Sequence, residues 1–307
     1  MFKLLTECFY KKESKPGFKK VLAFRNALLK DHQVISVTDF GAGSRVFSSE
    51  RRKVSAIAKN AGISKKRALL LNKLTSYLKC KNALELGTSV GISSAAIAAG
   101  NNLQLTTIEG CPETANIARE YFRKFELDNI TLIVGEFEEV LNGFLEKQEP
   151  RDKNQDKRQN IEDGRPESED RMDSGDGRPK TEERMESGDG RPETEAQNHP
   201  QTSFLFPLSS FLSPLSTKNH KPHPPDLFYF DGNHQKEATL HYFEKLLPLA
   251  HNDSVFIFDD IHWSGEMEEA WEHIKASPRV RVSVDTFYWG LVFFRKEQEK
   301  EHFTIRL

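Results

Sequence analysis

The sequence predicts an α/β fold: a doubly wound, mostly parallel seven-stranded sheet with a terminal antiparallel strand pair and a helical N-terminal cap. After Cys80, short apolar runs alternate with helical runs, which is typical of a parallel sheet covered on both faces. The last two apolar runs, 280–285 and 290–295, are joined by too few residues for a parallel crossover. This last pair of strands is therefore expected to be antiparallel.

The individual elements follow from the spacing of apolar residues along the chain. Helices are expected in the N-terminal part at 18–31, 49–60 and 65–78. Strands are expected at 83–86, 103–108, 130–134, 226–230, 254–258, 280–285 and 290–295. Helices at 91–99, 112–125, 137–145, 237–247 and 266–276 are expected between them, one with Pro112 in its first turn.

A long polar insertion interrupts this alternation. Residues 148–200 contain 26 charged side chains and only four apolar ones, too few to offset the entropy lost on ordering. The tetrapeptide DGRP recurs three times at a spacing of 13, but a repeat without apolar residues buries nothing on stacking. We therefore predict a cap at 1–79 and a Rossmann-like domain at 80–307, interrupted by a disordered low-complexity insertion at 148–225.

Composition excludes several classes of protein. The net charge is −2 and the insertion is acidic, so the remainder is only mildly basic, below the charge density of a typical nucleic-acid binder. The three cysteines form no C-x-x-C pair, which argues against a zinc site and for a reduced, cytoplasmic compartment. No apolar run approaches the roughly 20 residues of a membrane span. The sequence does not indicate an oligomeric state.

The segment ALELGTSVGISSA, at 83–95, is a strand that enters a glycine-containing turn and then a helix. Gly87 and Gly91 allow a tight turn and a close approach of the backbone to a ligand, and the helix start offers unpaired N–H groups. Glu109 ends the next strand, 24 residues after Glu85. A carboxylate at that place accepts both hydroxyls of a ribose, so a nucleotide-like ligand is expected here.

A second glycine loop, DFGAGSR at 39–45, fits this interpretation less well. It is followed by a basic helical stretch and not by a strand that ends in an acid. We assign the loop to the cap, where either it is a plain connection or it helps to close the site beside Arg45, Arg51 and Arg52. The sequence does not decide between these two roles.

Acidic residues and histidines end two later strands. Asp231 follows one apolar strand and is followed by His234, and Asp259 and Asp260 end another, before His262. Because ligands bind at the carboxyl ends of parallel strands, these side chains are expected near Gly87 and Glu109. Three close carboxylates repel one another unless a cation binds them or their pKa values rise.

This oxygen-rich set suits Mg²⁺ better than zinc. His234 is then a candidate general base, because imidazole titrates near neutral pH and can take the proton of a hydroxyl group. The alternatives are that Asp260 caps the helix after it, that His262 lies on the surface, and that Asp231 binds a ligand without metal. The sequence leaves these alternatives open.

The motifs ELGTSVG, TTIEG, YFDGNH and IFDDIHWS, in this order and spacing, resemble class I S-adenosylmethionine-dependent methyltransferases over about 80–147 and 226–295. The D-x-x-H motif and the later D-D pair are similar to metal-dependent O-methyltransferases of small hydroxylated molecules. One departure is Ser89, which stands where the family has a further glycine. The resemblance implies S-adenosylmethionine as cofactor, a small-molecule acceptor and no membrane partner.

The resemblance also implies the residues of the site. Cofactor binding is expected from the residues at the ends of the first, second, third and fourth strands of the sheet, which are Glu85, Gly87, Thr88, Ser89, Gly91, Glu109, Gly110, Glu136, Phe137 and Asp231. Asp231, Asp259 and Asp260 are the implied ligands of Mg²⁺. His234, with Asp231, is the implied catalytic pair, in which His234 deprotonates the acceptor hydroxyl before it attacks the methyl group in line.

Two other functions share part of this pattern. A NAD-dependent oxidoreductase has the same strand, glycine turn and acidic strand end, but the G-x-G-x-x-G spacing is missing after Glu85. A non-catalytic nucleotide-binding module would keep the turn and use the insertion for interaction. The sequence does not define the methyl acceptor.

Overall fold

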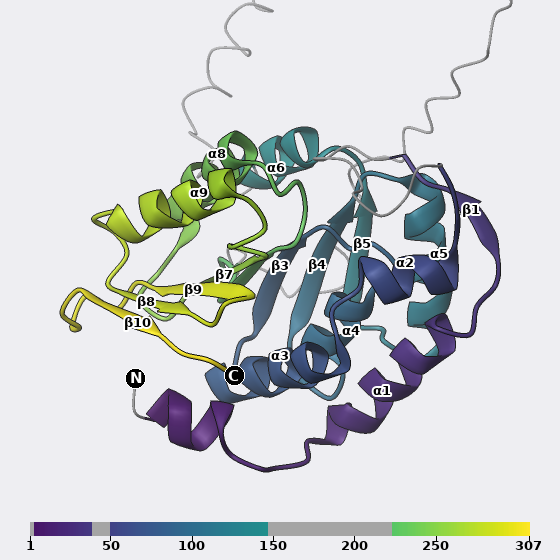
Figure 1. Cartoon of the computed structure of the whole chain (residues 1–307), viewed down its shortest axis with the longest axis horizontal. Helices are drawn as coiled ribbons and strands as arrows, with labels where there is room; N and C mark the ends of the chain where they lie inside the picture. Colours follow the sequence, from purple (N-terminus) through teal and green to yellow (C-terminus); the bar gives the residue numbers. More distant parts are fainter. Residues whose placement is uncertain (1–2, 39–49, 147–222) are drawn as a thin grey trace, which may run out of the picture. The chain divides into compact units, whose positions relative to one another are not determined.

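A central sheet of eight strands organises the residues that the structure describes (Figure 1). The structure is a computed structural model that describes residues 3–38, 50–146 and 223–307. The predicted glycine loop at 39–45 and almost all of the predicted insertion at 148–225 lie outside the described residues. The described residues belong to one of the two compact units of the chain, and the predicted domain boundaries stay a prediction.

The strands of the sheet are β3 (Asn82–Leu86), β4 (Gln104–Glu109), β5 (Ile130–Val134), β6 (Leu227–Phe230), β7 (Val255–Asp259), β8 (Val282–Asp285), β9 (Trp289–Phe293) and β10 (Glu301–Thr304). Their order is β10-β8-β9-β7-β6-β3-β4-β5. Strands β3 to β7 pair in parallel, whereas β9 runs antiparallel to both β7 and β8. The parallel strands therefore place their carboxyl ends at one edge, which is where ligands bind in open α/β sheets.

Helices cover both faces of the sheet (Figure 1). One face is covered by α6 (Phe137–Glu146), α8 (Lys236–Leu246) and α9 (Gly265–Ala276), and the other by α1 (Pro16–Leu28), α3 (Lys65–Leu78), α4 (Ile92–Ala98) and α5 (Pro112–Lys124). Because side chains alternate along a strand, Leu84 and Leu86 enter the first apolar layer while Ala83 enters the second. The expected doubly wound arrangement is confirmed.

The chain before β3 contains η1 (Leu4–Phe9), β1 (Val34–Ser36), β2 (Arg51–Lys53) and α2 (Val54–Asn60) in addition to α1 and α3. The helix expected at 49–60 begins only at Val54, because Arg51–Lys53 pairs with Val34–Ser36 as an antiparallel strand. The strand β1 is held against α5 because the N–H of Ser36 donates to Glu113 at 2.6 Å. A non-local pairing thus replaces the first turn of the expected helix.

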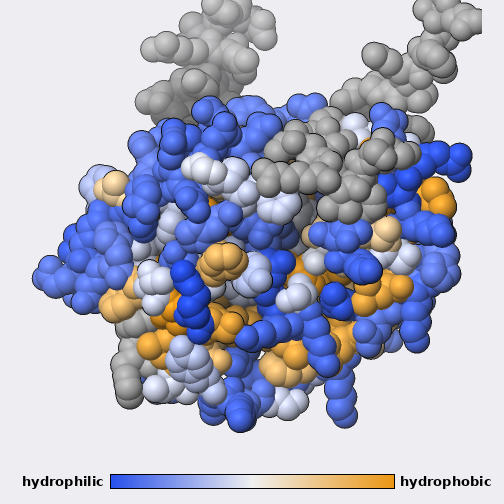
Figure 2. Space-filling view, viewed as in Figure 1, coloured by the Kyte–Doolittle hydropathy of each residue, from blue (hydrophilic) through white to orange (hydrophobic). Residues whose placement is uncertain are grey.

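The seven predicted strands of the sheet are all present, with ends within two residues of those expected. The eighth strand, β10, was not predicted. It consists of EHFT, which has no apolar alternation, and it pairs in parallel with β8 from Glu301 opposite Val282. None of the helices in the described residues is both long and apolar enough to cross a membrane. The face shown in Figure 2 is mostly hydrophilic, with apolar patches between the polar areas.

Candidate functional site

The turn between β3 and α4 is built on left-handed backbone. Gly87 and Gly91 have φ angles of 100° and 87°, and Ser89 between them has a φ of 48°. Glycine adopts such angles readily, whereas a serine must be held there by its surroundings. The N–H groups of Gly87 and Thr88 donate to the carbonyl of Ile108 at 3.0 and 3.1 Å, which fixes the turn to β4.

Glu109, at the end of β4, faces this turn. One carboxylate oxygen, Oε2, accepts the N–H of Ser89 at 2.7 Å, and the other accepts the N–H of Cys111 at 3.0 Å. The side chain remains partly exposed. Both oxygens thus take part in fixing the turn to the end of β4. The structure therefore brings the predicted acid and the glycine turn together.

Glu85 points from β3 into the layer under α4 and is fully buried. Its Oε2 accepts hydrogen bonds from Ser94 and from Thr107, the latter at 2.6 Å, and Thr107 also contacts Thr88. Its Oε1 is buried and has no partner among the described residues. Burial raises the pKa of Glu85 to about 7, and hydrogen bonds from hydroxyl groups, among them those of Ser94 and Thr107, limit that rise.

The loops after β4, β5 and β6 converge near the turn. The N–H of Gly135 donates to the carbonyl of Glu109 at 3.0 Å. Phe137 opens α6, and a β-carbon on Gly232 would lie 2.7 Å from its ring. Of the remaining predicted cofactor residues in these loops, Gly110 is partly exposed and Glu136 is exposed.

Three acidic residues follow β6 and β7, as predicted. The Asp259 side chain is 3% exposed; its Oδ2 accepts the hydroxyl of Tyr229 at 3.1 Å, and its Oδ1 accepts the N–H of Asp260 at 2.9 Å. Asp231 is hydrogen-bonded to Asp259 as well. Burial raises the pKa of Asp231 well above its usual range, and the negative charge of Asp259 raises it further.

Arg67 completes this cluster, and the sequence analysis did not find it. Its Nη1 lies 2.9 Å from Oδ1 of Asp259 and 3.6 Å from Oδ1 of Asp260. Burial opposes the charged form of Arg67, but the negative charges of Asp259 and Asp260 outweigh it and raise its pKa. Arg67 and Asp259 are 192 positions apart, so no local pattern could have indicated this contact.

His234 lies beside the acidic cluster on the loop after β6. Its ring centroid is 6.2 Å from that of Trp263, whose side chain is 38% exposed. A small pocket is lined by Gly232 and His234 of the loop after β6, together with residues of β6, β7, α8 and α9, among them Phe230, Asp259 and Tyr242. The structure therefore places the predicted base next to the predicted carboxylates.

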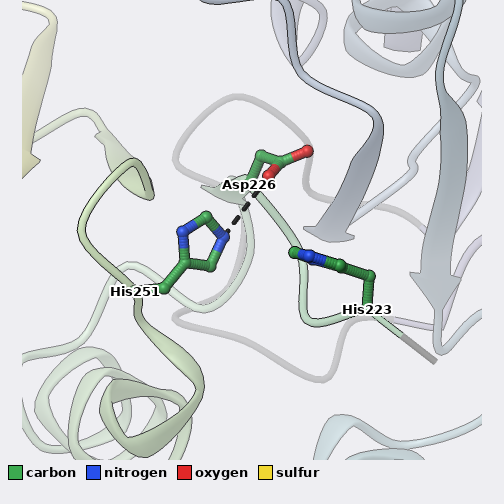
Figure 3. Close-up of side chains that lie close together, drawn as sticks. All are labelled: His223, Asp226 and His251. Atoms are coloured by element: carbon green, nitrogen blue, oxygen red, sulfur yellow. Dashed lines mark ion pairs between the residues drawn. The ribbon is translucent and has the colours of Figure 1, made fainter. Parts of the chain in front are cut away.

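The predicted metal ligands are less well gathered. Among the described residues, His223, Asp226 and His251 have possible metal-ligand atoms that all lie within 4.8 Å of one another. The three aspartates that the sequence predicted as ligands do not meet this distance. The cluster of the two histidines and Asp226 lies at the amino ends of β6 and β7 (Figure 3). The N–H of Asp253 donates to Nδ1 of His251, so Nε2, 3.3 Å from Asp226, carries the hydrogen of a neutral ring. This contact is a histidine–aspartate pair.

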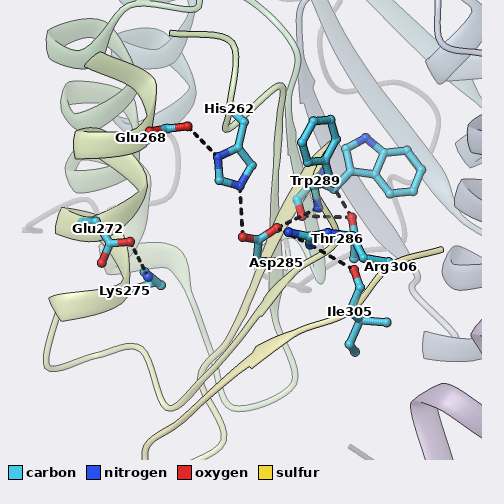
Figure 4. Close-up of polar contacts among 10 residues, drawn as sticks. His262, Glu268, Glu272, Lys275, Asp285, Thr286, Trp289, Ile305 and Arg306 are labelled. Carbon is cyan, nitrogen blue, oxygen red and sulfur yellow. Dashed lines mark hydrogen bonds and ion pairs between the residues drawn. The ribbon is translucent and has the colours of Figure 1, made fainter. Parts of the chain in front are cut away.

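His262 does not face the acidic cluster. Its two ring nitrogens contact Glu268 and Asp285, each at 3.0 Å (Figure 4). Asp285 also accepts the N–H of Phe287. Burial opposes protonation of His262, but its bonds to Glu268 and Asp285 outweigh it and raise the pKa. The residue thus holds the loop between β8 and β9 against α9.

Comparison with solved structures places the fold. The SAH-bound methyltransferase PaMTH1 from Podospora anserina superposes with a TM-score of 0.50 at 12% identity, over 94% of this chain and 92% of that chain. The O-methyltransferase from Bacillus cereus in complex with SAH gives 0.45 at 16% identity, over 93% and 94%. At sequence identities of 12% and 16%, this structural similarity shows the fold and not the activity. No curated protein sequence matches significantly.

Two family models match the sequence, one over a stretch that contains the glycine turn and the other over a stretch that contains strand β6. One is described as O-methyltransferase and matches residues 47–154, and the other is described as methyltransferase domain and matches residues 165–261. The chain is a class I S-adenosylmethionine-dependent methyltransferase. The matched stretches contain the motifs ELGTSVG, TTIEG and YFDGNH and the first five residues of IFDDIHWS, and neither model describes an oxidoreductase.

Proposed function

We propose that this methyltransferase transfers the methyl group of S-adenosylmethionine to a hydroxyl oxygen of a small-molecule acceptor. The observation that carries the proposal is the position of Glu109, whose carboxylate ends β4 and bonds the N–H of Ser89 in the glycine turn. A carboxylate at the end of the second strand of such a sheet suits the two hydroxyls of the ribose. The match to an O-methyltransferase model supports oxygen as the methylated atom.

The rest of the cofactor would lie on both sides of Glu109. The methionine part would lie over the turn of Gly87, Thr88, Ser89 and Gly91, near Glu85, whose Oε1 has no partner in the described residues. The adenine would lie by Gly110, Glu136 and Phe137, in the loops that follow β4 and β5. The left-handed turn and the unpartnered buried oxygen both fit such a ligand.

His234 would act on the acceptor. Bound S-adenosylmethionine supplies a methyl group made electrophilic by the positive sulfur. The imidazole of His234 would take the proton of the acceptor hydroxyl, and the oxygen would attack the methyl carbon in line, forming a C–O bond as the C–S bond breaks. The exposed indole of Trp263 beside His234 offers an apolar surface for the acceptor. Asp231, bonded to Asp259, would orient this side of the site.

A magnesium ion on Asp231, Asp259 and Asp260 was the second cofactor predicted. The described side chains do not fit it as they stand, because both oxygens of Asp259 accept hydrogen bonds and Arg67 supplies a positive charge. No step of the proposed reaction therefore uses a metal. The cytoplasmic location also stays a prediction; the three cysteines are all free, as a reduced compartment requires.

Titration of the protein with S-adenosylmethionine and with NAD tests the proposal. We expect S-adenosylmethionine to bind, and Glu109→Gln to weaken it about 10- to 100-fold, because charge-assisted hydrogen bonds contribute about 1.5–3 kcal/mol each. Glu269→Gln, which alters an exposed ion pair with Lys236, is the matched control and should bind like wild type. Binding of NAD alone, or unchanged affinity in Glu109→Gln, would overturn the proposal.

The proposed role of His234 as general base is tested by measuring the rate of methyl transfer. We expect a panel of small phenols, catechols and sugars to contain an acceptor that consumes S-adenosylmethionine, and His234→Gln to slow that reaction at least about 100-fold. The cofactor should still bind the variant with wild-type affinity. A non-catalytic module would bind the cofactor and show no turnover with any acceptor in the panel.

A further inference from the structure

Arg67 is held in place independently of the carboxylates that it contacts. Its backbone N–H donates to the Oγ of Ser64, the N-cap of α3, at 3.3 Å, so the residue stands in the first turn of a capped helix. The guanidinium also lies over the ring of Tyr288, with 4.9 Å between its central carbon and the ring centroid. A cation in this position above an aromatic face is attracted to it. The side chain is 21% exposed.

The carboxylate of Asp259 has its acceptor positions filled by protein donors. A carboxylate accepts about four hydrogen bonds. Here Oδ1 accepts the N–H of Asp260 and Nη1 of Arg67, both at 2.9 Å, and Oδ2 accepts the hydroxyl of Tyr229. Asp231 contributes a further bond to the same carboxylate. A metal ion could bind Asp259 only if one of these donors moved away.

Arg67 contacts two of the three carboxylates that were expected to bind the ion. Its Nη1 contacts Asp259 and Asp260 together, as a cation shared by the end of β7 would. Magnesium requires oxygen ligands at about 2.0–2.1 Å in nearly octahedral geometry and keeps several waters. The three aspartates do not offer three oxygens within 4.8 Å of one another among the described residues.

We infer that the guanidinium of Arg67 is the resident cation of this carboxylate cluster and holds it without a divalent metal ion. The inference rests on the proposed function only for its catalytic consequence, which is that methyl transfer by this protein needs no magnesium. Arg67 is then a positioning residue, which acts on the acceptor site through Asp259 and Asp260. Because arginine keeps its proton at all ordinary pH values, this charge is permanent.

Manganese binding to the full-length protein, followed by electron paramagnetic resonance, tests the inference without any acceptor. Mn²⁺ is used as a paramagnetic substitute for Mg²⁺. We expect that any Mn²⁺ bound by the wild type is bound equally by Asp259→Asn, so that no ion is held by Asp259. We expect Arg67→Gln to bind one ion per chain, because the variant leaves the carboxylates without a positive charge, and we expect Arg67→Gln with Asp259→Asn to lose that ion.

Two further variants make the result specific. Arg67→Lys keeps a positive charge and should behave like the wild type. Arg306→Gln removes a different arginine, 3.4 Å from Asp285, and should not gain Mn²⁺ binding. Thermal melting of each variant establishes that it is folded. On addition of Mn²⁺, a stabilising shift larger than that of the wild type should appear in Arg67→Gln alone, since the cluster of His223, Asp226 and His251 is the same in every variant.

Asp259-dependent binding of Mn²⁺ by the wild type would overturn the inference, and so would a folded Arg67→Gln variant that binds no ion. Titration with S-adenosylmethionine in the same preparations keeps the two proposals apart. If the cofactor does not bind, the proposed function fails, while the Mn²⁺ experiment still reports on Arg67. Once an acceptor is known, wild-type turnover should be the same with EDTA as with Mg²⁺.

Discussion

The carbonyl oxygen of Asp231 lies 2.4 Å from the position that a β-carbon on Gly87 would occupy. No side chain larger than hydrogen fits between them, so the cofactor turn and the end of β6 can approach this closely only with glycine at 87. The φ angle of 100° at the same residue is also one that other residues rarely adopt. The turn at the predicted cofactor site and the strand end at the predicted acceptor site are thus fixed to each other.

We therefore expect Gly87→Ala to weaken both folding and cofactor binding. The left-handed backbone alone costs about 1–3 kcal/mol for a non-glycine residue, and the clash with Asp231 adds to it. Thermal melting and titration with S-adenosylmethionine measure the two effects. The control is Gly265→Ala at the start of α9, where a β-carbon meets nothing within 4 Å, and its stability should be unchanged or slightly higher. Wild-type behaviour of Gly87→Ala would contradict the prediction.

The buried Glu85 should make stability depend on pH. Its pKa rises from 4.5 to about 7 in the folded protein, so the folded state holds this proton more tightly than the unfolded chain does. The resulting stabilisation is fully present below about pH 4.5 and is lost as the pH rises through about 7. Glu85→Gln removes the titrating group.

The measurement is urea unfolding at several pH values between 4.5 and 7. We expect the decline in the free energy of unfolding over this window to be shallower in Glu85→Gln than in the wild type. Glu299→Gln, at an exposed position near the C-terminus, should keep the wild-type slope. Equal slopes in all three proteins would show that Glu85 does not carry the predicted proton.

The elements that the sequence predicted well are those with a local cause. Strands β3 to β7 are apolar runs bounded by turns, and the glycines of the turn at 87–91 are required by its backbone angles. Glu109 could be predicted because parallel strands end at one edge, and its contact with Ser89 follows from that geometry. The pattern along the chain was sufficient in these cases.

The features that the sequence missed depend on contacts between distant segments. Strand β2 forms because Arg51–Lys53 meets Val34–Ser36, and β10 forms because a polar segment meets the free edge of β8. The largest omission in the site is Arg67, which reaches Asp259 from a helix before the first strand of the main sheet. Three carboxylates in sequence suggested a metal, because the positive charge that the fold supplies was not visible.

Asn72 should be important for the position of the helix that carries Arg67. It is buried in α3, and its Nδ2 donates to the carbonyls of Ala96 at 2.9 Å and Ala99 at 2.7 Å, at the end of α4. Asn72→Ala leaves these carbonyls without their side-chain donor, and we expect a loss of about 1–3 kcal/mol in the free energy of unfolding. Urea unfolding measures it. Asn142→Ala, at an exposed position of α6, should lose almost nothing; equal losses would contradict the explanation.

The second unit of the chain, Pro150–Lys221, should be dispensable for folding and for cofactor binding. The described residues, which all lie outside this segment, already form an apolar cluster on each face of the sheet. A flexible Gly/Ser linker of about 20 residues spans roughly 25 Å, and a fourfold shortening of a loop changes its closure entropy by only about 1 kcal/mol. We expect the shortened protein to keep the wild-type melting temperature within a few degrees and the wild-type affinity for S-adenosylmethionine.

A variant with the same segment composition in scrambled order is the matched control, because it separates the effect of sequence from that of length. If the cofactor affinity falls in the shortened protein and in the scrambled one, while both remain folded, then specific residues of this segment contribute to the site. If only the shortened protein is impaired, the linker is too short for the gap that it must bridge. Wild-type binding in both would place the whole cofactor site on the elements that surround β3 and β4.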